Sequence, residues 1–225
     1  MCGRFTLRAP ASLVAQQFGL LDTPLLEPRF NVAPSQAVAV VRLTPDAARL
    51  RRELAWLRWG LIPAWATAAS IGNRLINARA ETAAEKPAFR AAFRRRRCLV
   101  VADGFYEWQR VERHKQPYFF RLRDDGPFGI AALWEVWEGP SQTRVESCTL
   151  LTTMANELVR PIHDRMPVIL APADYERWLD PAVEKPGPLL PLLGSYPSQA
   201  MAAYAVSSLI NSPGHEDPRC IEPLR

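Results

Sequence analysis

Cys98-Leu99-Val100-Val101-Ala102 is the first of a series of strand-like runs that fills the middle of the chain. The runs that follow cover residues 105–110, 118–122, 128–137 and 145–153. They are rich in apolar and aromatic residues, and turn signals such as Asp124-Asp125-Gly126 and Gly139-Pro140-Ser141 separate them. Strands joined by short turns predict an antiparallel sheet, and this stretch therefore decides the fold.

Further strands and helices are expected on both sides of this stretch. Strand-like runs also cover residues 37–43, 53–59, 167–170 and 202–206, the first two joined by a turn around Pro45-Asp46. Helical patterns cover residues 10–18, 81–97 with an interruption near Pro87, 155–160 and 172–179. Many short strands with peripheral helices indicate an α+β fold. We expect a single domain over residues 1–225, built on a curved antiparallel sheet or barrel-like core.

Composition limits the class of protein. The chain has 225 residues, of which 48% are hydrophobic, so it can bury a sizeable core. No apolar run approaches the roughly 18 residues of a membrane span, and no signal segment opens the chain, so we expect a cytoplasmic monomer with no membrane partner. The net charge of +5 comes almost entirely from arginine, which suits phosphate contacts but is a weak indicator of a nucleic-acid partner.

The four cysteines do not form a metal-binding or disulfide pattern. They are Cys2, Cys98, Cys148 and Cys220, no two of them make a CxxC motif, and the three histidines are not clustered with them. We therefore expect no metal and no other cofactor. Cys98 and Cys148 lie in apolar runs and are expected in the core.

Cys2 is the residue with the most distinctive chemistry. Removal of Met1 would leave a cysteine with a free α-amine and a thiol on adjacent carbons, and an α-amine has a pKa of about 7.7–8.0. Such a group attacks an aldehyde through the amine to give a Schiff base, which the thiol then closes to a thiazolidine ring. It also suits N-terminal nucleophile hydrolysis. The alternative is that a start codon merely precedes a cysteine.

Three polar residues interrupt otherwise apolar segments. Asn77 is either a satisfied core amide or a turn or capping residue. Glu107 lies among aromatic residues, where a buried carboxylate has either a partner or a raised pKa; the alternative is that strand alternation points it to solvent. His163 is either a proton shuttle or a structural histidine.

Six motifs resemble, in order along nearly the whole chain, those of the SRAP (SOS response-associated peptidase) family. They are Met1-Cys2-Gly3-Arg4-Phe5, Asn31-Val32-Ala33-Pro34, Trp59-Gly60-Leu61-Ile62-Pro63-Ala64-Trp65, Asn77-Ala78-Arg79-Ala80-Glu81-Thr82, Asp103-Gly104-Phe105-Tyr106-Glu107-Trp108 and Ile162-His163-Asp164-Arg165-Met166-Pro167. The match is weakest over residues 180–225, where only Val206-Ser207 and Asn211 are recognised.

The resemblance implies an abasic-site sensor of the DNA damage response, active in the cytoplasm and nucleoid-associated when bound. Such proteins bind abasic sites in single-stranded DNA and form a thiazolidine crosslink between the N-terminal cysteine and the ring-opened deoxyribose. The family also implies that residues before Cys2 are removed, either by the protein itself or by an aminopeptidase.

Residue roles follow from the same resemblance. Cys2 would supply amine and thiol, Asn77 would hold the amine, and Glu107 would orient or deprotonate it and help to reverse the linkage. His163 would act as acid and base on the sugar ring oxygen. The resemblance also implies a DNA-binding set, in which Arg4 and Arg79 contact phosphates, and Pro34 and Trp65 fill the space of the missing base. Trp59 is expected in the core, Trp65 fits either core or stacking, and Thr152 either touches DNA or ends a strand.

Three other functions remain open. One is a glutamine amidotransferase or hydrolase of the N-terminal nucleophile class, which also opens Met-Cys-Gly, although Arg4-Phe5 and the absence of a downstream His-Arg-Gly motif disfavour it. The second is a general peptidase. The third is a single-stranded DNA-binding module with no covalent chemistry.

Overall fold

The computed structural model describes residues 2–46, 49–112 and 114–224. The strands are β1 (Phe5–Leu7), β2 (Arg29–Val32), β3 (Ala37–Asp46), β4 (Arg49–Trp59), β5 (Asn77–Arg79), β6 (Arg97–Ala102), β7 (Gly104–Val111), β8 (His114–Leu122), β9 (Phe128–Glu138), β10 (Arg144–Met154), β11 (Arg165–Pro167), β12 (Ile169–Leu170) and β13 (Met201–Ala205). The α-helices are α1 (Ala11–Phe18), α2 (Ala80–Ala83), α3 (Arg90–Arg95) and α4 (Tyr175–Leu179). Short 3₁₀ helices cover Ala69–Arg74, Pro140–Gln142, Pro172–Asp174, Leu190–Leu193, Ser198–Ala200, Ser208–Asn211 and Pro218–Ile221.

Five strands close into a barrel. Each strand pairs with the next in the order β10, β4, β3, β6 and β9, and β9 pairs back onto β10. All these pairings are antiparallel except that of β10 with β4, where Ser147 lies opposite Arg58 and Cys148 opposite Trp59. The expected α+β class and barrel-like core are confirmed, with two parallel pairings, of β10 with β4 and with β5, added to the antiparallel ones.

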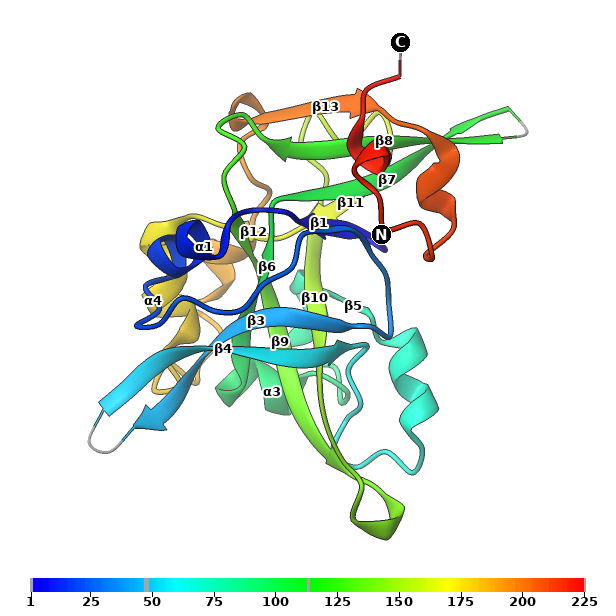
Figure 1. Ribbon diagram of the computed structural model, residues 1–225. Helices are drawn as coiled ribbons and strands as arrows, with labels where there is room; N and C mark the ends of the chain where they lie inside the picture. The colour runs from blue at the N-terminus through cyan, green and yellow to red at the C-terminus, as the bar shows by residue number, and fades with distance from the viewer. Residues whose placement is uncertain (1, 47–48, 113, 225) are drawn as a thin grey trace.

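A second sheet lies against one end of the barrel (Figure 1). Its strands are antiparallel in the order β13-β8-β7-β1-β2, so the first strand of the chain is flanked on both sides. The β7–β8 hairpin extends well beyond the rest of this sheet (Figure 1). None of the helices among the described residues is long and apolar enough to cross a membrane.

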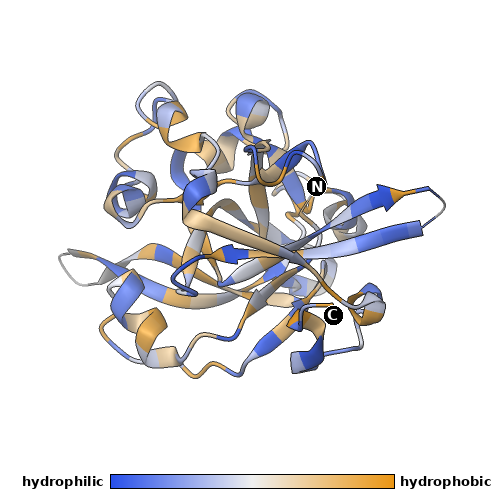
Figure 2. Cartoon of the chain, turned by 90° about the horizontal axis from the view of Figure 1, so that it is seen from above, coloured by the Kyte–Doolittle hydropathy of each residue, from blue (hydrophilic) through white to orange (hydrophobic). Residues whose placement is uncertain are grey.

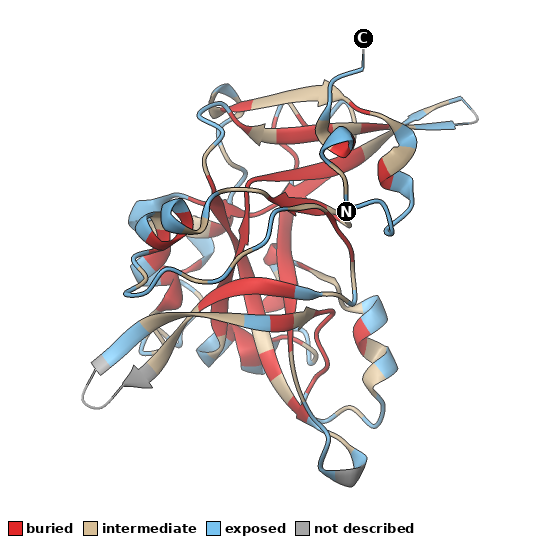
Figure 3. Ribbon diagram, viewed as in Figure 1, coloured by how far each residue is buried: buried red, intermediate tan, exposed pale blue. Residues whose placement is uncertain are grey.

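Apolar side chains form separate cores on the two sides of the barrel wall. Inward-facing residues such as Val40, Leu57 and Val100 fill the barrel together with Cys98 and Cys148, as expected for these cysteines. Alternate residues of the same strands face outward into a core that α1, α3 and α4 cover. Figure 3 shows the resulting continuous burial along the barrel strands, with exposed residues on the hairpin tips and outer helices.

Two glycines fix the loop that leads to β5. Gly60 has a φ of 127°, and a Cβ at this position would lie 2.6 Å from the carbonyl oxygen of Gly72. A Cβ on Gly72 would in turn lie 2.6 Å from the Gly60 carbonyl oxygen. Only glycine permits this backbone contact, which presses the irregular segment 61–76 against the barrel before Asn77 begins β5.

Several local expectations differ from the structure. Pro45-Asp46, expected at a turn, are the last residues of β3, whereas the interruption expected near Pro87 is confirmed by the gap between α2 and α3. Residues 155–160 form turns instead of a helix. The side-chain Oδ1 of Asn156 accepts hydrogen bonds from the amides of Leu158 and Val159, and Pro161 prevents the turn from continuing as a helix.

Candidate functional site at the N-terminus

The far end of β10 brings together two segments that are distant in sequence. β5 pairs in parallel with this end, so that Asn77 lies opposite Leu150. β11 pairs with β10 slightly further along, and Arg165 lies opposite Met154. The residues that precede β11 include His163. Asn77, on β5, and His163, just before β11, are therefore brought to the same end of β10.

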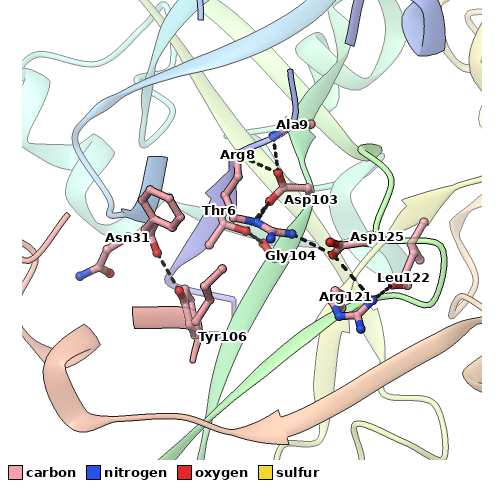
Figure 4. Close-up of polar contacts among 12 residues, drawn as sticks. Thr6, Arg8, Ala9, Asn31, Asp103, Gly104, Tyr106, Arg121, Leu122 and Asp125 are labelled. Carbon is pink, nitrogen blue, oxygen red and sulfur yellow. Dashed lines mark hydrogen bonds and ion pairs between the residues drawn. The ribbon is translucent and has the colours of Figure 1, made fainter. Parts of the chain in front are cut away.

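A buried carboxylate anchors the beginning of the chain. Asp103, between β6 and β7, accepts a 2.5 Å hydrogen bond from the Thr6 hydroxyl and a 2.7 Å bond from the Ala9 amide. Its other contacts are with Arg8, whose backbone amide and Nε both donate to it. Figure 4 shows these groups converging on the carboxylate. Because β1 also pairs with β7 through Phe5 and Phe105, the segment before Phe5 is held near Glu107.

Cys2 lies in a closed, apolar setting. The residue is fully buried, and its Sγ lies 3.8 Å from the carbonyl oxygen of Arg4. Burial, and then the nearby charge of Glu107, raise the pKa of the Cys2 thiol far above its usual range. The Nδ2 of Asn77 donates a 2.8 Å hydrogen bond to the Cys2 carbonyl oxygen. Asn77 Oδ1 is buried and accepts no hydrogen bond from the described part of the chain.

Glu107 is a carboxylate held away from water. The residue is only 2% exposed, and burial raises the pKa of its carboxyl above the usual value, while His163 acts in the opposite direction. Glu107 is electrostatically coupled both to Cys2 and to His163. It therefore occupies a position between the N-terminal segment and the histidine.

His163 is held by its own backbone and faces a cavity. Its Nδ1 accepts a 3.0 Å hydrogen bond from the Arg165 amide and lies 3.0 Å from the Asp164 carboxylate. The cavity has a volume of about 440 Å³ and is lined by Glu107, Trp108, Lys115, His163 and Asn211.

An ion pair locks the two strands that flank β10. Arg165 makes a bidentate contact with Glu81, at 2.7 and 2.9 Å, and also donates to the Thr152 carbonyl oxygen at 2.5 Å. Thr152 is fully buried, and its hydroxyl lies within 3.5 Å of the Ala78 carbonyl oxygen. Thr152 lies near the end of β10, and its contact with DNA stays a prediction.

The other expected DNA-binding residues do not line this cavity. Arg79 is exposed at the end of β5, Trp65 is 61% exposed, and Pro34 is half-buried. The exposure of Trp65 excludes its alternative place in the core, whereas Trp59 is fully buried as expected. These residues lie on accessible surface, and their contact with DNA stays a prediction.

Arg4 has partners within the protein. Its Nη1 donates to Asn31 Oδ1 at 2.8 Å and to the Ile210 carbonyl oxygen at 2.5 Å, and its Nη2 donates to the Asn211 carbonyl oxygen at 3.4 Å. Partial burial lowers the pKa of the Arg4 guanidinium. Arg4 thus ties β1 to the 3₁₀ helix Ser208–Asn211, which supplies Asn211 to the cavity.

Sequence reasoning missed several residues of the site. Asp103 and Trp108 belong to a recognised motif but received no role, and Lys115 carries no local signal that would single it out. Arg165 and Glu81 also belong to recognised motifs, but their pairing depends on strand order. Among the described residues, no group of three or more His, Cys, Asp or Glu side chains could hold a metal ion.

Comparisons with known proteins agree with one another. The model of a family described as SOS response associated peptidase (SRAP) matches residues 1–213. The abasic site processing protein YoqW of Bacillus subtilis (strain 168) is 43% identical over 99% of this chain and 99% of its own length. The abasic site processing protein HMCES of Xenopus tropicalis is 30% identical, over 89% of this chain and 67% of its own. A crystal structure of a Bacteroides thetaiotaomicron protein superposes with a TM-score of 0.87 at 27% identity, and each chain covers 100% of the other.

Replacement of Asp103 by asparagine tests the anchor of the N-terminal segment. We expect Asp103→Asn to lower the free energy of unfolding by roughly 1.5–3 kcal/mol, the range for hydrogen bonds to a charged group. Urea unfolding measures this, and hydrogen exchange should show faster exchange of the Arg8 and Ala9 amides. Asp22→Asn, at an exposed position, is the matched control and should change stability by less than about 0.5 kcal/mol. Equal effects of the two substitutions would contradict the anchoring role.

Proposed function

The chain belongs to the SRAP family, and from this membership and the geometry around Cys2 we propose that it processes abasic sites in single-stranded DNA by covalent capture. After removal of Met1, the amine and thiol of Cys2 would form a thiazolidine with the ring-opened deoxyribose. The relatives named abasic site processing proteins support the substrate. The observation that carries the chemistry is the position of Cys2, hydrogen-bonded by Asn77 and coupled to a buried carboxylate beside a cavity.

The proposed reaction balances with the loss of one water. The α-amine adds to the aldehyde carbon to give a carbinolamine, which loses hydroxide as water to form an imine. The thiol sulfur then adds to the imine carbon, and the thiol proton passes to the nitrogen. Because burial raises the thiol pKa, the thiol stays protonated near neutral pH, and the amine is the first nucleophile.

Each remaining polar group has a matching step. The raised pKa of Glu107 brings it closer to the working pH, as suits a group that accepts the proton of the attacking amine and returns it when the linkage reverses. His163, which lines the cavity, can donate a proton to the sugar ring oxygen and favour the open-chain aldehyde. Asn77 Oδ1, an acceptor without a partner in the described structure, can receive an N–H of the freed amine.

The DNA strand would be held by contacts that ignore sequence. Arg79 and Trp65 are both exposed, so Arg79 would bind a phosphate, and the ring of Trp65, with Pro34, would stack near the missing base. Arg4 can contribute to phosphate binding only if the DNA competes with, or adds to, its bonds to Asn31 and Ile210. Stacking on aromatic rings tolerates every base, which a lesion sensor requires.

Covalent capture predicts a stable adduct on a denaturing gel. A single-stranded oligonucleotide with one abasic site should give a shifted band that survives SDS without a reductant. The band should vanish with Cys2→Ala or with an intact base, while Cys98→Ala, a buried cysteine of the barrel, should leave it unchanged. If no band forms although mass spectrometry shows that Met1 is gone, the crosslinking proposal fails, and a glutaminase assay tests the amidotransferase reading.

The pH dependence of adduct formation should report Glu107. Below its raised pKa the carboxyl is protonated and cannot accept the amine proton, so the rate should fall as pH decreases through that value. Glu107→Gln should lose this limb, keep the limb that belongs to the amine, and slow the maximal rate by roughly 100-fold or more. Single-turnover gel assays from pH 4 to 9 measure both features. An unchanged profile in Glu107→Gln would remove Glu107 from the proton transfer.

A further inference from the structure

The β7–β8 hairpin supplies walls of the cavity that the capture chemistry does not use. Glu107 and His163 have proposed roles in that chemistry, but Trp108 and Lys115 line the same cavity without one. Trp108 lies on β7 opposite Pro117, and Lys115 is the second residue of β8, nearer the tip of the hairpin. In Figure 2 the two arms of this projection are largely hydrophilic. The hairpin is therefore a polar extension that begins at the edge of the reaction cavity.

Two cations face each other across the hairpin. Arg110 and Lys115 are directly opposite in the strand register, so their side chains share one face, with Cβ atoms about 4.5–5.5 Å apart. Both residues are exposed, and within the described residues neither takes part in a hydrogen bond or ion pair through its side chain. Like charges directly opposite destabilise a strand pair. This cost is offset when an anion binds between them.

Trp108 adds a fixed aromatic wall next to these cations. Its Nε1 donates a 2.8 Å hydrogen bond to Asn211 Oδ1, which sets the orientation of the ring. The residue is half-buried, so part of the indole still borders the cavity. An aromatic ring beside exposed cations is the combination that single-stranded nucleic acid requires, with stacking for the base and charge for the phosphate.

The position of these groups relative to Cys2 indicates which part of the strand they contact. Asn77, which donates a hydrogen bond to the Cys2 carbonyl oxygen, and the exposed Arg79 lie on β5. Glu107, Trp108 and Lys115 lie on the β7–β8 hairpin and line the cavity with His163. A strand that presents its lesion to Cys2 would thus meet cations from two separate elements, β5 and the hairpin.

We propose that Lys115 and Arg110 bind the phosphate, and Trp108 stacks on the base, of a nucleotide that flanks the abasic residue. This subsite rests on the proposed function, since it assumes that single-stranded DNA occupies the cavity. It is separate from the covalent step, because among the described residues no hydrogen bond or ion pair joins any of the three side chains to Cys2. It contributes affinity and leaves the chemistry at Cys2 unchanged.

Binding without crosslinking isolates the subsite. The probe is a single-stranded oligonucleotide with a tetrahydrofuran abasic analogue, which has no aldehyde, and fluorescence anisotropy measures its affinity over a range of salt concentrations. Lys115→Gln/Arg110→Gln should weaken binding at least fivefold and lower the slope of log affinity against log salt by about 0.7, the value for one phosphate on a single strand. Arg94→Gln, an exposed arginine of α3, is the control and should change neither.

A scan of the DNA backbone then locates the phosphate. Replacing one phosphate at a time by a neutral methylphosphonate should weaken binding of the wild type at one flanking position and leave the double variant unaffected there. Trp108→Ala should weaken binding, but not when the flanking nucleotide also lacks its base, while Trp108→Phe should retain most of the affinity. The subsite is wrong if the double variant has the same salt slope as the wild type. It is also wrong if each methylphosphonate weakens binding of the double variant as much as it weakens binding of the wild type.

The two proposals fail in different ways. If the gel assay gives an adduct but the hairpin variants bind the tetrahydrofuran probe like the wild type, covalent capture stands and the subsite is wrong. If no adduct forms but the hairpin variants lose affinity as expected, the subsite stands and the protein is a non-covalent binder. Circular dichroism of each variant confirms that the hairpin is still folded.

Discussion

The carboxylate of Asp103 is the interaction on which the site depends. Chain termini usually fray unless they are tied down, yet here Cys2, the second residue, is fully buried. Asp103 accepts hydrogen bonds from Thr6, Arg8 and Ala9. If the first strand left the sheet, the buried Asp103 carboxylate would lose these donors and remain unpaired, which is costly. Rigidity at this point is what keeps Cys2 beside Asn77 and Glu107.

Burial of Cys2 also determines what kind of nucleophile the site presents. A low thiol pKa would give an exposed thiolate that reacts with oxidants and other electrophiles. Here burial raises the thiol pKa, so in the proposed reaction the α-amine freed by removal of Met1 would be the more available nucleophile. Because the thiazolidine product needs both the amine and the neighbouring thiol, the proposed reaction selects for aldehydes. The same environment that suppresses general thiol chemistry therefore favours the proposed reaction.

The sequence predicted the elements better than their arrangement. Strand-like runs around Cys98 and Cys148 were correctly assigned to the core because burial and β-propensity are local properties. The parallel pairing of β10 with β4 and β5 was missed, since it joins segments far apart in sequence and depends on closure of the barrel. The helix expected after Met154 was wrong because Asn156 caps its own turn and Pro161 follows.

For the site, motifs identified residue types but not their environment. That Asn77 contacts the Cys2 carbonyl, or that Arg165 pairs with Glu81 across β10, follows only from strand order. The burial of Thr152 and the exposure of Trp65 were equally undecided by pattern, since each residue type occurs in both settings. Trp108 and Lys115 became visible only when the hairpin register placed them at one cavity.

The structure of the adduct itself tests the central claim most directly. The crosslinked protein would be denatured, treated with iodoacetamide without a reductant, digested and mapped by mass spectrometry. The account predicts an N-terminal peptide that begins at Cys2, carries the deoxyribose remnant less one water, and is not alkylated, while Cys98, Cys148 and Cys220 are alkylated. A remnant attached elsewhere, or an adducted peptide in which Cys2 is alkylated or still preceded by Met1, would contradict it.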